Sequence, residues 1–185
     1  ARTPAFDRIA ASGVTFMNNY CQFPLSGPTR ASVLTGLRPD HTGVWTLDGI
    51  FRRNNPEIVS LPQLFAAHGY ETVGIGKVYH PLSDETYNND PVSWTKPYIK
   101  PQAPVYMLPE GKPVTECVDV PDNAYFDGRV ADEAVAWIDS LSRSDKPFFL
   151  AVGFIRPHLP FVAPEKYWDL YDRDKMPLAE FRDTV

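Results

Sequence analysis

The chain has 185 residues, of which 43% are hydrophobic and 13% aromatic, and this is enough to build one sizeable core. A net charge of −5 without any block of Lys and Arg argues against a nucleic-acid partner. No apolar run approaches the ~20 residues of a membrane-spanning helix, and the polar start of the chain does not resemble a signal peptide. The two cysteines, Cys21 and Cys117, permit one disulfide, but we expect two free thiols.

The first residues predict a short helix followed by an extended segment. Phe6 and Ile9 fall on one face of a helix over 4–12, and Gly13 ends it. Residues 14–17, Val-Thr-Phe-Met, then have strand character.

The stretch over 26–40 combines hydroxyl, Gly, Pro and Arg residues around a short apolar core. Because Gly27-Pro28 favours a sharp turn, we expect Ser26 to lie outside a short helix that Thr29 caps. The Ser26 oxygen would then lie beside a helix N-terminus and near Arg30, an environment that suits an anion or an oxygen that attacks one. The same residues are also typical of an ordinary loop that leads into a helix, so the local pattern leaves both interpretations open.

A second helix and a strand follow. Residues 56–68 predict a helix with Leu61, Leu64 and Phe65 as its buried stripe. Residues 70–78 predict an interior strand, because apolar side chains recur through it.

Residues 79–122 predict a long Pro-rich loop that shapes a pocket, since disordered linkers rarely carry so many aromatic residues. A small hairpin is expected within it, with 105–108 on one side and 114–120 on the other. Its aromatic residues are possible sugar-stacking surfaces, with packing as the equal alternative: Trp94, Tyr98 and Tyr106. Its acidic cluster of Asp84, Glu85 and Asp90 is expected to be a solvated face.

The last third predicts a helix over 127–142 and a continuous apolar strand over 148–154. Helix then strand, twice over, indicates an α/β fold with a mostly parallel central sheet and helices on both faces. Ligands bind beyond the carboxyl ends of the strands in such sheets. Lys77 with His80 lies at one such end and His158 at another, so the pattern predicts a site there.

Each of these residues also has a structural interpretation. Lys77 could be a surface lysine at a frayed strand end, and His80, before a proline, is more typical of a loop residue. His158 stands between two prolines just past the most apolar strand, a rigid frame that favours a functional imidazole. No spacing of Asp and His in the chain makes a complete metal site.

Four ordered motifs resemble the type I sulfatases of the alkaline phosphatase-like superfamily, in their iduronate-2-sulfatase branch. The signature resembles its serine-type form, Ser26-Gly-Pro-Thr-Arg30, with Leu-Thr-Gly at 34–36. The other motifs are the helix-strand unit over 3–16, Gly-Lys-Val-Tyr-His-Pro at 76–81, and the strand over 148–154 with Pro-His-Leu-Pro-Phe at 157–161.

The resemblance implies roles for five residues. Ser26 matches the residue that is oxidised to formylglycine, whose hydrate offers one hydroxyl to attack sulfur and a second to expel sulfate by elimination. Arg30 matches the Arg that holds the formylglycine and the sulfate oxygens, and Lys77 the Lys that neutralises sulfate charge. His80 matches a His near the hydrate and sulfate, and His158 the His that contacts sulfate and protonates the departing sugar oxygen.

The resemblance also implies one divalent cation, usually Ca²⁺, bound by the modified Ser26 and by carboxylates that this chain does not contain. The chain is therefore expected to be a single incomplete catalytic domain, an internal fragment that is inactive alone. The implied partners are a sulfated carbohydrate and a maturase that acts on serine. The implied location is periplasmic or secreted.

The resemblance predicts hydrolysis of a sulfate ester on a sulfated sugar or glycosaminoglycan. Two alternatives stay open. An unmodified Ser26 could act directly as the nucleophile of a phosphatase or phosphodiesterase, or the protein could be a non-catalytic carbohydrate-binding protein that has kept the fold.

Overall fold

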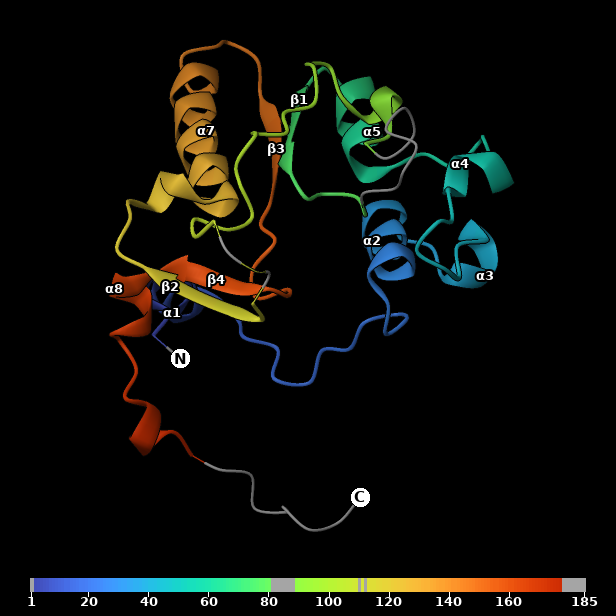
Figure 1. Cartoon of the computed structure of the whole chain (residues 1–185). Helices are drawn as coiled ribbons and strands as arrows, with labels where there is room; N and C mark the ends of the chain where they lie inside the picture. The colour runs from blue at the N-terminus through green and yellow to red at the C-terminus, as the bar shows by residue number, and fades with distance from the viewer. Residues whose placement is uncertain (1, 81–88, 110, 112, 178–185) are drawn as a thin grey trace.

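The computed structural model describes residues 2–80, 89–109, 111 and 113–177. Two parallel strand pairs organise them (Figure 1): β1 (Glu71–Gly76) with β3 (Phe148–Gly153), and β2 (Thr115–Val118) with β4 (Phe161–Pro164). The β1–β3 register runs from Glu71 opposite Phe148 to Gly76 opposite Gly153, so both strands end at the same edge. The predicted α/β fold with parallel strands is confirmed.

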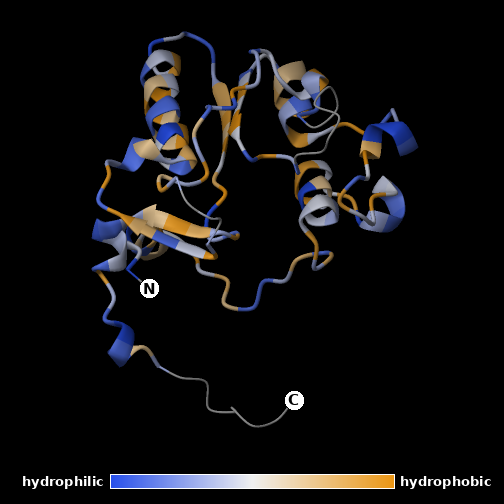
Figure 2. Ribbon diagram, in the orientation of Figure 1, coloured by the Kyte–Doolittle hydropathy of each residue, from blue (hydrophilic) through white to orange (hydrophobic). Residues whose placement is uncertain are grey.

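Helices cover both faces of the β1–β3 pair (Figure 1). α7 (Phe126–Leu141) lies on one face, and α2 (Ser26–Thr35) and α5 (Leu61–Ala67) lie on the other. Val73 and Ile75 of β1 point to the α7 side and are fully buried against Val130. The two strands are mostly apolar in Figure 2, and polar residues recur along α7. Apolar clusters pack on both faces of the sheet, one with α7 and the other with α2, so the core lies against both faces.

Shorter elements complete the described chain. The remaining helices are α1 (Pro4–Ala11), α3 (Pro39–Thr42), α4 (Phe51–Asn54) and α8 (Glu165–Trp168). Three-residue 3-10 helices occur at Pro91–Ser93, Asp122–Ala124 and Arg173–Lys175. No helix of the described residues is both long and apolar enough to cross a bilayer. Both cysteines are free thiols, as predicted.

The predicted helix over 56–68 begins later than expected, at Leu61. Ser60 is its N-cap and forms a capping box with Gln63, which stabilises a start at this position. With this start Pro62 faces the core, while Leu61 and Leu64 are 41% and 48% exposed. The predicted buried stripe is therefore wrong except for Phe65, which stacks on Phe149 of β3.

Two predicted extended segments have no strand partner. Residues 14–17 are not a strand and lie exposed. They do not pair with β1, whose two edges are occupied by β3 and by residues 95–99. The predicted hairpin is also wrong. Residues 105–108 form no strand, and β2 pairs in parallel with β4 instead.

The described part of the 79–122 segment packs onto β1 rather than standing free. Trp94 is 9% exposed and contacts Tyr98, whose ring covers Gly74. Neither ring is free to stack on a sugar, because both belong to the core. Asp90 is buried in an ion pair with Arg52, so its expected solvated position is wrong; Asp84 and Glu85 lie outside the described residues.

Candidate active site

Ser26 lies in the first turn of α2, so the prediction that it precedes the helix is wrong. Pro28 is tolerated there because a proline in the first turn lacks only an N–H that would have no helical partner. Gly27 packs so closely that a Cβ atom would lie 2.8 Å from the Thr46 carbonyl oxygen. Thr29 is not the cap either, since Leu25 takes that position and the Thr29 hydroxyl donates to the Phe23 carbonyl.

Arg30 joins α2 to the carboxyl end of β1. Its Nε lies 3.3 Å from Ser26 Oγ, and its Nη1 donates to the carbonyls of Lys77 at 2.6 Å and Val78 at 2.9 Å. Burial lowers the pKa of Arg30, and the nearby Tyr98 opposes this shift. Two backbone carbonyls just beyond β1 thus hold the guanidinium beside the Ser26 oxygen.

The ends of β1 and β3 approach too closely for side chains. A Cβ atom on Gly153 would lie 2.0 Å from the Lys77 carbonyl oxygen, and the Lys77 N–H donates to the Gly153 carbonyl at 2.7 Å. Tyr98 donates to the Gly76 carbonyl at 2.6 Å and accepts from the Val78 N–H at 3.1 Å. This role of Tyr98 could not be predicted from the sequence, because it depends on how a distant loop packs on β1.

Burial, followed by the charges of neighbouring cations, lowers the pKa values of Lys77 and His80. Burial lowers the pKa of Lys77, and the Arg30 charge lowers it further. Burial also lowers the pKa of His80, followed by the charges of Lys77, Arg30 and His158. His80 Nδ1 is buried and has no hydrogen-bond partner among the described residues. Within the same part of the chain, no carboxylate forms an ion pair with Arg30 or Lys77.

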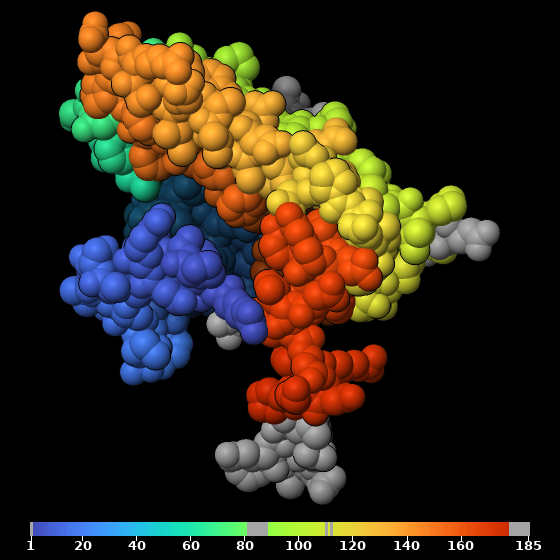
Figure 3. All heavy atoms as spheres, turned by 90° about the vertical axis from the view of Figure 1, so that its left-hand side faces the viewer, coloured from blue at the N-terminus to red at the C-terminus, as the bar shows by residue number. Residues whose placement is uncertain are grey.

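Three of the five predicted site residues line one cavity of about 640 Å³: Ser26, Arg30 and Lys77. The space-filling view shows the surface hollowed between the N-terminal segment and the residues that follow β3 (Figure 3). His80 lines a smaller recess of about 40 Å³ that also touches Arg30. His158 is exposed on the loop after β3, near enough to His80 to influence its pKa.

These residues suit an anion but not a metal ion. The described residues include no group of three or more His, Cys, Asp and Glu that could hold a metal. The expected calcium site is therefore not formed by them. What they offer is an oxygen on the first turn of a helix, two cations and an unpartnered imidazole nitrogen.

Comparison with known proteins gives a consistent picture. The sulfatase family model matches residues 1–183. The chain is 33% identical to mouse iduronate 2-sulfatase, over 96% of this chain and 35% of that protein. It is 36% identical to a sulfatase of Formosa agariphila, over 92% of this chain and 37% of that protein. The chain thus spans about a third of the length of these relatives.

Solved structures show the same fold. The phosphonate monoester hydrolase of Agrobacterium radiobacter matches with a TM-score of 0.70 at 20% identity, over 96% of this chain and 40% of that one. Ps i-CgsB, solved in complex with k-i-k-neocarrahexaose, matches with a TM-score of 0.60 at 17% identity, over 84% of this chain and 40% of that one.

Proposed function

Because the chain belongs to the sulfatase family, we propose that the protein hydrolyses sulfate esters and that Ser26 supplies the reacting group. The observation that carries this proposal is the charge around the Ser26 oxygen. Arg30 and Lys77 line the same cavity, and no described carboxylate neutralises either of them. An unneutralised cation pair next to an oxygen nucleophile favours a substrate that brings its own negative charge.

Each of the five residues has a role in this proposal. Formylglycine made from Ser26 would supply a hydrated aldehyde, with one hydroxyl for attack and one for expulsion of sulfate. Arg30 orients this group and a sulfate oxygen, and Lys77 stabilises the charge that builds on sulfate. His80 contacts the bound anion, and His158 donates a proton to the departing oxygen. The described residues do not form a calcium site, and we propose that the 185 residues alone are inactive.

We further propose a sulfated sugar as substrate. The support is the likeness to mouse iduronate 2-sulfatase, together with a structural neighbour solved with neocarrahexaose. A serine-specific maturase and a periplasmic or secreted location follow from the same proposal.

The test is mass spectrometry together with kinetics on the full-length protein, produced with the maturase. The tryptic peptide over 9–30 should lose two hydrogens when Ser26 becomes formylglycine. Ser26→Ala should abolish turnover of an aryl sulfate, while Ser142→Ala, on the exposed end of α7, should leave it unchanged. Activity with Ser26 unmodified would contradict the proposed chemistry.

A phosphatase or phosphodiesterase is the second candidate, since an unmodified Ser26 Oγ beside Arg30 could also attack phosphorus directly. Parallel assays with an aryl sulfate and an aryl phosphate distinguish the two functions. Turnover of phosphate by unmodified protein would favour the second. Binding of sulfated sugar without turnover of either ester would favour a non-catalytic protein.

A further inference from the structure

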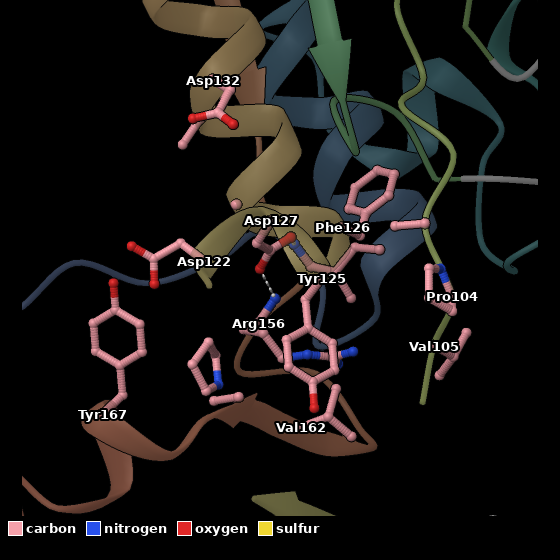
Figure 4. A pocket seen from close by; sticks show the side chains of 16 residues that line it. Pro104, Val105, Asp122, Tyr125, Phe126, Asp127, Asp132, Arg156, Val162 and Tyr167 are labelled. Atoms are coloured by element: carbon pink, nitrogen blue, oxygen red, sulfur yellow. Dashed lines mark hydrogen bonds between the residues drawn. The ribbon is translucent and has the colours of Figure 1, made fainter. Parts of the chain in front are cut away.

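Asp127 holds the loop that carries His158. It lies in the first turn of α7, and its two carboxylate oxygens accept the backbone N–H groups of Ile155 and Arg156, each at 2.8 Å. Figure 4 shows the Asp127 side chain pointing at the Arg156 nitrogen along the wall of a cavity of about 450 Å³. Both oxygens thus accept hydrogen bonds from the segment that follows β3, and not from the N-terminal amides of α7.

The bonds made by Asp127 continue to the His158 backbone. The His158 N–H donates to the Ile155 carbonyl at 2.9 Å, and the Arg156 guanidinium donates to the His158 carbonyl. A carboxylate that fixes residues 155 and 156 therefore fixes the turn in which His158 stands.

The imidazole itself is also oriented. His158 Nδ1 lies 2.8 Å from the Leu159 carbonyl oxygen. Because a carbonyl can only accept, Nδ1 carries the hydrogen, and Nε2 is the nitrogen that can exchange a proton with a substrate.

The helix that carries Asp127 is held in place by its packing against the sheet. Val130 is fully buried and Ala134 is 7% exposed, and both pack against β1 and β3. Two hydrogen bonds to a carboxylate are stronger than the neutral bonds that water would offer to the same amides. A fixed helix and a charged double acceptor together limit the freedom of the loop.

We propose that Asp127 is a positioning residue that acts through the Ile155 and Arg156 amides to aim His158 Nε2 at the leaving oxygen. This inference rests on the proposed sulfatase function. In the step it serves, the attacking oxygen supplied by residue 26 forms a bond to sulfur, the S–O bond to the sugar breaks, and the electron pair of the broken bond stays on the sugar oxygen. That oxygen takes the proton from Nε2 of the protonated ring.

The test compares two sulfate esters in the full-length protein. Asp127→Asn keeps the shape of the side chain but leaves only one acceptor oxygen. The amide NH₂ group of the new side chain then faces a backbone N–H, so one of the two hydrogen bonds is lost. We expect kcat for a sugar sulfate to fall about tenfold or more, and kcat for 4-nitrophenyl sulfate to fall by less than about threefold. A nitrophenolate leaves without a proton, so it does not need the acid. KM should change little for either ester, and the matched control Glu133→Gln, exposed on the same helix, should behave as wild type.

Hydrogen exchange gives a second measurement that does not depend on turnover. The peptide over 154–160 should exchange faster in Asp127→Asn than in wild type, while the control is unchanged. Equal losses on both esters, no loss on either, or unchanged exchange would overturn the role of Asp127. A wild-type protein that turns over neither ester would instead overturn the proposed function, and this inference with it.

Discussion

Arg30 should contribute to stability as well as to catalysis, and Arg30→Gln tests this dual role. Its guanidinium is the donor to the carbonyls of Lys77 and Val78. Glutamine is uncharged and too short to donate to both carbonyls. In the variant, each carbonyl therefore either accepts a hydrogen bond from water or has no donor.

The expected cost follows from those two hydrogen bonds. A hydrogen bond to a charged group contributes ~1.5–3 kcal/mol, which gives ~3–6 kcal/mol for the pair if both are fully lost. The site is only half-buried, so water recovers part of this. We therefore expect the free energy of unfolding to fall by about 2–4 kcal/mol.

Urea unfolding followed by tryptophan fluorescence measures this change. The matched control is Arg38→Gln, an exposed arginine just beyond α2, for which we expect a change of less than about 0.5 kcal/mol. Arg30→Lys should restore part of the anion binding but little of the stability, because an ammonium lacks the planar fork. If the free energy of unfolding of Arg30→Gln is no lower than that of Arg38→Gln, the two carbonyl contacts do not stabilise the fold.

Two further predictions concern the strand ends and the anion site. Gly153→Ala should lower the free energy of unfolding by about 3 kcal/mol or more, since its Cβ would meet the Lys77 carbonyl oxygen at 2.0 Å; wild-type stability in the same urea titration would contradict this. Inorganic sulfate should bind more tightly as the pH falls through the range in which His80 gains a proton, and calorimetry should detect proton uptake. The reason is that burial and then the charges of Lys77, Arg30 and His158 lower this pKa in the free protein, whereas a bound anion raises it. The dependence should disappear in His80→Asn, and a slope that persists there would assign the proton to another group.

The parts of the fold that could be predicted from the sequence are those that depend on local pattern. The continuous apolar run over 148–154 and the amphipathic pattern over 127–142 predicted β3 and α7 closely. The late start of α5 has a signal in the sequence that the prediction did not use, because Ser60 and Gln63 have the spacing of a capping box. The strand expected over 14–17 is wrong, because strand character in a short segment does not determine whether that segment meets a partner strand.

The candidate site could be predicted only in part. The rule that ligands bind at the carboxyl ends of parallel strands predicted a site at Lys77, His80 and His158. Of these three, Lys77 lines the cavity of Ser26, whereas His80 lines a smaller recess. The position of Ser26 inside the helix could not be predicted, since it depends on the fit of Gly27 against a distant carbonyl. The contacts of Arg30 and Asp127 are equally non-local, because each joins a helix to the backbone beyond a strand.

The parallel pairing of β1 with β3 also bears on how fast the molecule folds. Residues 77–147 lie between the two strands, so pairing β1 with β3 closes a long loop. The chain loses conformational entropy when this loop closes, before the contacts between the strands can stabilise the pair. The backbone hydrogen bonds within α7 join residues that are close in sequence, so this helix can begin to form before the strands pair. The carbonyls beyond β1 and the amides beyond β3 reach their final places only when the strands have paired. We therefore expect the surroundings of Ser26 to be assembled in the slowest step of folding, so that variants which delay strand pairing lower the yield of competent protein even where the final stability is unchanged.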